Sequence, residues 1–221
     1  MGIKTSAPEI TTPFSTEFDR QLRTLQQKGC AGLAGLTNEQ FAAQLEPLKE
    51  QLSELNPATF DAKDGKLPFV IVITRDLVSP EQTVRLFTWG DHHCTVDLSP
   101  RSISHFAPTP DTPIPAGGAY LLVDIDRGRE TLNIPPAEAI KTLQQEQRSP
   151  LTIEEGIAIL THHPEFLVMN NCFSLLGSRC GDRRVPALWI SERRPRLGWC
   201  WEGAPHTRLG SASCLARLGP S

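Results

Sequence analysis

Apolar residues recur at helical spacing in two segments near the start of the chain. In the first, Phe18, Leu22 and Leu25 are separated by four and three positions, which predicts an amphipathic helix over residues 15–28. Gly29 follows at a position typical of a helix C-terminus. The second helix is predicted to run from Thr37, as its N-cap, to about residue 55. Its apolar stripe consists of Phe41, Leu45, Leu48, Leu52 and Leu55.

Two continuous apolar runs predict strands that are covered on both faces. Residues 68–73 (PFVIVI) form the stronger run and are expected at the centre of a sheet, and residues 119–125 (AYLLVDI) form the other. The proline-containing stretch between them, residues 90–118, has little periodicity and is expected to be irregular. Residues 131–134 are interpreted as a short returning strand. Thr152, with a glutamate three positions later, predicts the capping box of a further helix.

Aromatic and branched residues are interrupted by turn residues towards the end of the chain. Three runs with strand character are separated by Gly, Pro, Ser and Asp, which predicts an antiparallel meander. They are residues 172–176, 185–190 and 197–201. Because side chains alternate along a strand, Trp199 and Trp201 are expected on one face and Cys200 on the other. The pattern leaves open whether the tryptophans face the core or a cleft.

Together these elements predict an α+β fold, because helices and strands do not alternate strictly along the chain. Two N-terminal helices are expected to pack on a mixed or antiparallel sheet whose spine is the C-terminal meander. Residues 1–14 are predicted to form a disordered tail. Residues 15–221 are predicted to form a single domain, with a helical part (15–56) and a sheet-containing core (67–211).

Charge is distributed unevenly, although the net formal charge is only −3. Residues 172–221 contain eight arginines and three acidic residues, whereas residues 67–171 contain seven basic and thirteen acidic residues. Arginine favours bidentate contacts with carboxylates and phosphates, so an anionic ligand is one interpretation. The other is pairing within the molecule, between the acidic middle and the basic end.

The composition argues against several classes of protein. The overall charge is negative and no nucleic-acid-binding motif is present, so a nucleic-acid partner is not expected. No apolar run approaches the roughly 20 residues of a membrane helix, so no membrane is expected either. The chain starts without the apolar segment of a secretory leader, and its six cysteines form no CxxC pair, which together favour a reduced, cytoplasmic location. A homo-oligomer is left open.

One candidate catalytic set combines Cys172, His206 and Asn170. A histidine lowers the pKa of a neighbouring thiol and an amide orients the imidazole ring, which are the parts of a cysteine nucleophile site. The competing interpretation is a core thiol, because cysteine is among the most buried residues and is inert when buried. Whether the protein is an enzyme is therefore left open.

Arginine and tryptophan side chains near the meander indicate a second kind of site, an anion pocket with an aromatic wall. A surface of arginines around a tryptophan core is the alternative. The candidate ligand-binding residues are Arg179, Arg183, Arg184, Trp199, Trp201 and Arg208.

Three histidines, His162, His163 and His206, are candidates for metal ligation. The first two fall at the end of the helix that Thr152 begins, where the negative end of the helix dipole favours histidine for stability alone. The sequence identifies no cofactor.

Five short segments carry a family resemblance. They are residues 181–191 (GDRRVPALWIS), 197–201 (LGWCW), 205–207 (PHT), 67–70 (LPFV) and 151–156 (LTIEEG). With these segments the chain resembles an uncharacterised family of soluble bacterial proteins that is common in actinomycetes. The resemblance extends from about residue 18 to residue 211. Since that family has no known activity, the resemblance implies no catalytic residue.

The favoured function is binding, with or without turnover, of a small anionic or aromatic metabolite in a cleft lined by the meander. The alternative is a non-catalytic interaction or oligomeric structural protein that uses the leucine-striped N-terminal helices. The first function requires a concave pocket where His206 and a tryptophan converge with Arg183 or Arg184. The second requires exposed apolar side chains on the second helix.

Overall fold

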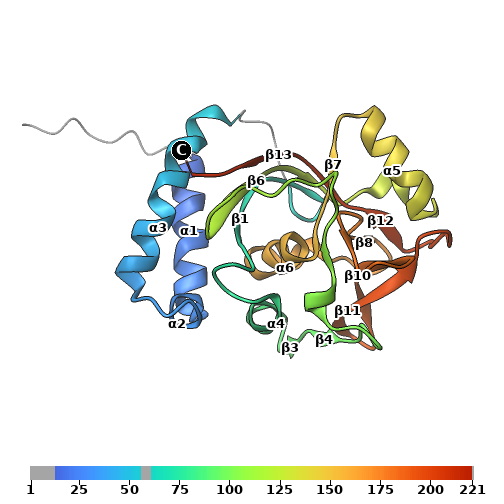
Figure 1. Cartoon of the computed structure of the whole chain (residues 1–221), viewed down its shortest axis with the longest axis horizontal. Coiled ribbons are helices and arrows are strands. Elements are labelled where there is room, and N and C mark those ends of the chain that lie inside the picture. Colours follow the sequence, from blue (N-terminus) through green and yellow to red (C-terminus); the bar gives the residue numbers. More distant parts are fainter. Residues whose placement is uncertain (1–12, 56–60, 221) are drawn as a thin grey trace, which may run out of the picture.

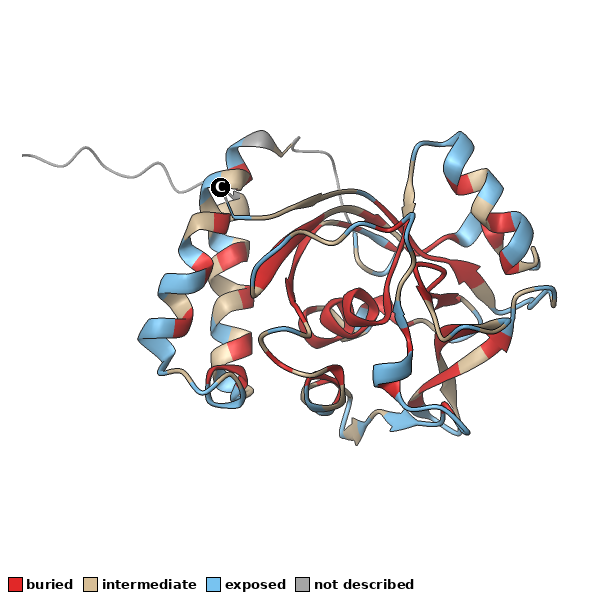
Figure 2. Ribbon diagram, in the orientation of Figure 1, coloured by how far each residue is buried: buried red, intermediate tan, exposed pale blue. Residues whose placement is uncertain are grey.

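Helix α6 (Ile153–His162) is the central element of the fold, and all ten of its residues are buried (Figures 1 and 2). The computed structural model describes residues 13–55 and 61–220. As predicted, Thr152 caps α6: its hydroxyl accepts a hydrogen bond from the Glu155 amide at 3.3 Å, and the Glu155 carboxylate accepts one from the Thr152 amide at 2.6 Å. One sheet lies on each side of α6, and both contribute to the core around it.

The first sheet is antiparallel throughout and has four strands in the order β1-β6-β13-β7. Their bounds are β1 Lys66–Ile73, β6 Ala119–Asp126, β13 Ser213–Leu218 and β7 Ser149–Pro150. In β1 the side chains alternate between the two faces: Val70 and Val72 pack towards α6, and Phe69 and Ile71 pack under the N-terminal helices. The central part of this sheet is therefore covered on both faces, as its apolar runs predicted.

Helices α1 (Pro13–Gln27) and α3 (Asn38–Glu50) cover the outer face of the first sheet, and the short helix α2 (Cys30–Leu33) lies between them (Figure 1). Both predicted helices are confirmed. The 3-10 turn η1 (Gln51–Glu54) extends α3.

Residues at the helix termini determine where these helices begin and end. Gly29, two residues after the end of α1, adopts the left-handed conformation, with φ of 80°. Thr37 caps α3 through a capping box with Gln40. The apolar stripe of α3 points inward, since Phe41 and Leu45 are at most 1 % exposed. The leucine-rich surface that the interaction hypothesis requires is thus part of the chain's own core.

The position of β1 differs from the prediction. Its apolar run indicated a central strand, but β1 lies at the edge of the first sheet. The fully buried side chain of Gln21, from α1, takes the place of a neighbouring strand: Nε2 donates to the Phe69 carbonyl at 3.2 Å, and Oε1 accepts from the Ile71 amide at 2.8 Å. The ring Nε2 of His162 lies 3.2 Å from the Ile71 carbonyl. Hydrophobic periodicity does not register a side chain that imitates a strand, so the pattern misplaced β1.

The second sheet has five strands in the order β12-β8-β10-β11-β4 and contains the predicted meander. Strands β8, β10 and β11 are antiparallel neighbours, whereas β12 and β4 join the two edges in parallel. The bounds are β12 Leu209–Ser211, β8 Cys172–Ser174, β10 Arg184–Ser191, β11 Arg194–Trp201 and β4 Thr95–Val96. Leu188 and Leu197 pack towards α6, and helix α5 (Pro136–Gln145) packs on the opposite face through Ala139. The layers therefore run helices, sheet, helix, sheet, helix (Figure 1).

Only short helices and strands occur in the segments that connect the long elements. Residues 90–118, which were predicted to be irregular, are one of these segments. The short elements include α4 Pro80–Thr83, η2 Val84–Leu86, β2 Thr88–Trp89, β3 His92–His93, η3 Ile103–His105, β5 Ala107–Pro108, η5 Pro164–Phe166 and β9 Ser178–Arg179. The predicted strand at residues 131–134 is wrong. The chain forms the 3-10 turn η4 (Arg129–Thr131) there, because the Thr131 hydroxyl donates back to the Gly128 carbonyl at 2.7 Å.

The α+β class is confirmed. The N-terminal helices pack on the first sheet, whereas the meander belongs to the second sheet. Most of the predicted disordered tail, residues 1–14, lies outside the described residues, and Pro13 and Phe14 belong to α1. The assignment of a single domain stays a prediction. In the part of the chain that the structure describes, no helix is long and apolar enough to cross a membrane.

Candidate functional site

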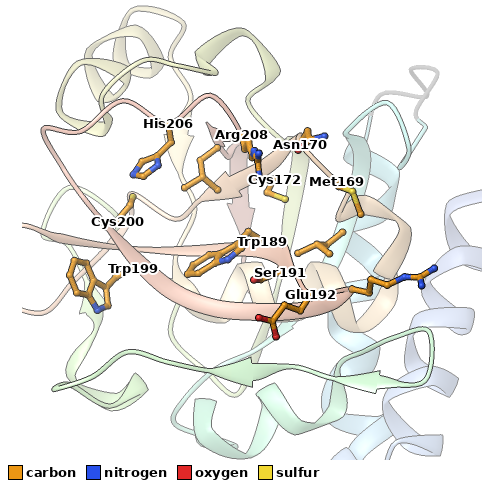
Figure 3. A pocket seen from close by; sticks show the side chains of 13 residues that line it. Met169, Asn170, Cys172, Trp189, Ser191, Glu192, Trp199, Cys200, His206 and Arg208 are labelled. Carbon is orange, nitrogen blue, oxygen red and sulfur yellow. The ribbon is translucent and has the colours of Figure 1, made fainter.

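A cavity of about 590 Å³ opens beside the β10–β11 hairpin of the second sheet (Figure 3). Its walls come from β10, β11 and the segments that lead into β8 and β12. The lining residues are Met169, Asn170, Cys172, Trp189, Ile190, Ser191, Glu192, Arg193, Trp199, Cys200, His206, Arg208 and Leu209. This volume lies within the range of roughly 300–1,000 Å³ that is usual for small-molecule sites.

Trp189 forms an aromatic wall of this cavity, and a glycine opposite makes room for it. A Cβ atom at Gly198, on the neighbouring strand β11, would lie 2.3 Å from Cη2 of the Trp189 ring. The glycine lets the indole lie directly against the backbone of β11. The ring is half-buried, so one part remains accessible from the cavity. An apolar surface of this kind suits a flat ring in a ligand.

The tip of the β10–β11 hairpin is conformationally strained. Ser191 pairs with Arg194, so the turn contains only Glu192 and Arg193, whose φ angles are 51° and 61°. Two-residue turns with positive φ at both positions strongly favour Asn-Gly, because other side chains crowd the backbone there. Asn170, on another part of the rim, has φ of 63°. Three of the six non-glycine residues with positive φ in the described chain therefore line this one cavity.

Several hydrogen-bond donors on the cavity wall have no partner. No hydrogen bond or ion pair among the described residues involves the guanidinium of Arg208, the ring of His206, the side-chain amide of Asn170 or the indole nitrogen of Trp189. Figure 3 shows these side chains around the same hollow. Asn170, His206 and Arg208 are exposed, so water satisfies their donors in the free protein, and a ligand that binds here replaces that water. The wall is therefore rich in donors and suits a ligand that accepts hydrogen bonds.

The cavity also contains Cys172, which comes near His206 and Asn170 in the same lining. Its thiol is buried and donates a hydrogen bond to the Val168 carbonyl at 3.3 Å. Burial raises the pKa of this thiol above its usual value, and the weaker effects of Arg127 and Arg208 do not reverse that direction. A protonated, hydrogen-bonded thiol is a poor nucleophile. The catalytic role of Cys172 stays a prediction, and its environment favours the core-thiol interpretation.

Of the four arginines predicted to bind a ligand, only Arg208 lines the cavity. Arg179 donates to the Leu176 carbonyl at 2.6 Å, and Arg183 Nε donates to Glu202 at 2.9 Å. Arg184 forms an ion pair with Asp182. Backbone carbonyls hold Arg179, whereas acidic side chains hold Arg183 and Arg184, and of these partners only Glu202 is distant in the sequence.

The two predicted tryptophans form a separate cluster with Arg184. The guanidinium carbon of Arg184 lies 4.8 Å from the ring centroid of Trp199 and 5.4 Å from that of Trp201. The two rings contact each other edge to face at 4.9 Å, so they do share one side of β11. Trp199 reaches the cavity lining, whereas Trp201 lies outside it and is 47 % exposed. Arg184 already occupies the faces that a cationic ligand would use.

The three predicted metal ligands are not brought together at one site, since His206 lies apart from the adjacent pair His162 and His163. His162 is buried at the end of α6, where burial lowers its pKa to about 3, and His163 lies 3.3 Å from both Glu17 and Glu165. His206 lines the cavity beside the second sheet. Across residues 13–55 and 61–220, no group of three or more His, Cys, Asp or Glu side chains is placed to hold a metal ion.

The sequence-based list of ligand-binding residues missed several parts of the cavity wall. The list did not include Glu192, Arg193, Met169 or Leu209, all of which line the cavity. The register of β10 and β11 supplies the missing clue: a two-residue turn that lacks Asn and Gly implies strain, which concentrates at functional sites.

Comparison with known proteins gives a family without an activity. Residues 24–220 match the Family of unknown function (DUF5701). No curated protein and no solved structure matches the chain. The match includes β1 to β13 and all of the cavity lining, which agrees with the resemblance carried by the short segments of the sequence. The chain belongs to DUF5701, a family of unknown function.

Proposed function

We propose that this protein binds a small anionic metabolite that carries an aromatic ring, in the cavity beside the β10–β11 hairpin. The observation that supports this proposal best is the set of donors without partners next to Trp189. Arg208, His206, Asn170 and the indole nitrogen all present N–H groups to one hollow. A carboxylate or phosphate oxygen satisfies such groups, and an aromatic ring fits the exposed part of the indole.

Charge on the cavity wall favours an anion. Arg193 and Arg208 contribute two positive charges and Glu192 contributes one negative charge, and no other lining residue is formally charged when His206 is neutral. Arginine binds carboxylates and phosphates through two parallel hydrogen bonds, which fixes their orientation. Arg208 is available for this contact because it makes no ion pair with any described residue.

The alternative, an interaction protein that docks through its N-terminal helices, has less support. The stripe that would form the docking surface packs against β1 and β6, and Leu48 is only 1 % exposed. The large apolar residues that are exposed are scattered over several elements. They are Leu33, Val96, Met169, Trp201 and Leu215.

The setting of this activity is also part of the proposal. We infer a cytoplasmic protein of bacterial origin. All six cysteines lie in the described part of the chain and all are free thiols, which is the usual state in a reducing compartment. The bacterial origin rests on the family resemblance of the sequence.

The proposal is tested by titrating the full chain with matched ligand pairs. Indole-3-acetate and benzoate are the probes, and indole-3-acetamide and benzamide are their uncharged counterparts. We expect the anions to bind more tightly than the amides. Arg208→Gln should weaken anion binding about tenfold or more, since a charge-assisted hydrogen bond contributes about 1.5–3 kcal/mol. Isothermal titration and the fluorescence of the cavity tryptophans measure the affinity.

Arg183→Gln is the matched control, because Arg183 directly precedes β10 and lies outside the cavity. The affinity of this variant for the anions should equal that of the unmodified protein. Equal binding of anions and amides would contradict the charge assignment. Failure of every ring-bearing anion to bind at millimolar concentration would overturn the proposal.

A further inference from the structure

A second cavity, of about 220 Å³, lies between the end of β1 and the start of α6. It shares no lining residue with the cavity beside the β10–β11 hairpin. Thr74, Arg75 and Asp76 follow β1 directly, Tyr120 comes from β6, and Glu154 comes from the first turn of α6. Its volume is below the range of roughly 300–1,000 Å³ for drug-sized ligands, so only a compact molecule fits.

The two adjacent glutamates of α6 differ in how their oxygens are used. Glu155 is fully buried and receives hydrogen bonds from Tyr120 at 2.7 Å, from Arg217 Nη2 at 2.9 Å and from the Thr152 amide at 2.6 Å. Glu154 is 8 % exposed and receives Arg75 Nε on Oε1 at 2.6 Å. Its other oxygen, Oε2, is buried and has no hydrogen-bond partner within the described chain.

An unpaired carboxylate oxygen inside a protein is costly, by about 1–3 kcal/mol or more when the group is charged. Arg75 does not serve both oxygens: its Nε and Nη2 both contact Oε1, and Nη2 also donates to the Phe106 carbonyl at 2.7 Å. Glu155 shows that this fold does supply enough donors to a buried carboxylate where the role is structural. Glu154 lines both the second cavity and a narrower hollow of about 20 Å³, and only the second cavity has room for a donor larger than a water molecule.

Charge around the second cavity selects the kind of donor. Arg75 contributes one positive charge, and Glu154 and Asp76 contribute two negative charges, so the lining carries a net formal charge of −1. Asp76 is exposed and makes no ion pair or hydrogen bond with any described residue. The N-terminus of α6 opposes a cation, but only with about half a positive charge. A single positive charge on the ligand therefore balances the site.

We propose that this second cavity binds a compact organic cation, a primary ammonium group on a short aliphatic chain. The ammonium group lies between the carboxylates of Glu154 and Asp76 and donates to the oxygen of Glu154 that Arg75 leaves free. A partial turn about the terminal torsion of Glu154, which is a soft one, lets one oxygen keep the bond to Arg75 while the other faces the ligand. The aliphatic part of the ligand lies against Tyr120, Pro108 and Pro115.

Tyr120 makes a direct test feasible, because it is the only tyrosine in the chain. In protein labelled with ¹³C in the tyrosine ring alone, every ring signal reports on this cavity. We expect n-propylammonium chloride to shift that signal in a saturable way. The neutral isostere n-propanol, sodium chloride and magnesium chloride at the same concentrations should not. Binding should also weaken as the pH falls, because a cation favours the ionised carboxylate of Glu154, whose pKa burial raises.

Two variants identify the carboxylates. Glu154→Gln should abolish the saturable shift, and Asp76→Asn should weaken the affinity about threefold, as expected for a partly exposed ion pair. Glu138→Gln, an exposed glutamate of α5 outside both cavities, is the control and should bind as the unmodified protein does. If Glu154→Gln does not fold, the exposed Asp76→Asn variant decides. An equal shift with n-propanol, a shift with magnesium instead, or unchanged affinity in Asp76→Asn overturns the proposal.

Discussion

The two sheets that flank α6 are completed in different ways. The outer face of the first sheet lies under α1 and α3, and Gln21 supplies the hydrogen bonds that its edge strand β1 would otherwise lack. The outer face of the second sheet is covered by α5 over part of its area, and the remainder borders a cavity of about 590 Å³. The polar groups at the edge of β1 are matched within the chain, whereas exposed donors beside the β10–β11 hairpin have no partner among the described residues. The contrast is therefore between a strand edge closed by a side chain of the protein and a cavity wall left open to solvent.

At the first sheet, the largest expected effect is a loss of stability in acid. His162 is buried against β1, and its folded-state pKa of about 3 lies below the ordinary value of 6.5. The unfolded chain therefore binds a proton that the folded chain rejects, so stability is complete above pH 6.5 and falls as the pH drops towards 3. The loss amounts to roughly 3 kcal/mol at pH 4.5 and roughly 5 kcal/mol below pH 3.

Urea unfolding at pH 7 and pH 4.5 measures this loss. In His162→Gln the difference between the two pH values should shrink by roughly 3 kcal/mol. The groups that face His162 are Arg20, His163 and Glu17, and Glu17 contributes an acid loss of its own that the variant retains. His93→Gln, at an exposed histidine of β3, should change nothing. Identical pH dependence in His162→Gln and the unmodified protein would show that His162 is not the titrating group.

An intermediate effect is expected at the edge of β1. Gln21→Leu leaves the Phe69 carbonyl and the Ile71 amide without their side-chain partner in a buried place, which costs about 2–4 kcal/mol. Gln26→Leu is the matched control on the same helix, since its hydrogen bond to the Asn38 carbonyl is exposed. The urea midpoint should fall strongly in the first variant and hardly move in the second. Ligand affinity at the second sheet should be unchanged in both, and a coupled loss would weaken the division between the two sheets.

The smallest expected effect is a gain in stability, and it lies at the second sheet. Replacing Glu192-Arg193 by Asn-Gly relieves two positive-φ positions and should stabilise the protein by about 1–2 kcal/mol. The same change removes Arg193 from the cavity wall and should weaken anion binding severalfold. Gln147→Gly relieves a φ of 55° outside this cavity, so it should add stability and leave affinity unchanged. A thermal melt and a titration on each variant separate the two outcomes.

Local signals in the sequence were sufficient for much of the fold. Thr37 with Gln40 and Thr152 with Glu155 define helix starts through contacts three residues apart, and both caps form as predicted. The meander follows from alternation and turn residues over short distances. The edge position of β1 was missed because Gln21, which lies some 50 residues away, provides the pairing. A polar residue in a helix is ordinarily expected on the surface.

The candidate site was predicted only in outline. His206, Arg208, Asn170, Cys172 and Trp199 do line one cavity. Arg183 and Arg184 were included because they are basic and close in sequence. They form ion pairs with Glu202 and Asp182, respectively, and lie outside the cavity. Which arginine is neutralised depends on acidic neighbours up to 19 residues away. A linear charge pattern does not contain that information.

The dependence of β1 on α1 has a consequence for how the family is divided and compared. The match to DUF5701 begins at residue 24, inside α1, so Gln21 precedes it. A fragment cut at residue 24 would present an open strand edge with a free carbonyl at Phe69 and a free amide at Ile71. Such an edge recruits the strand of another molecule, and the fragment should polymerise or precipitate while the full chain stays dispersed. A relative without the first helix must close this edge by other means, with its own side chain, a further strand or a second subunit.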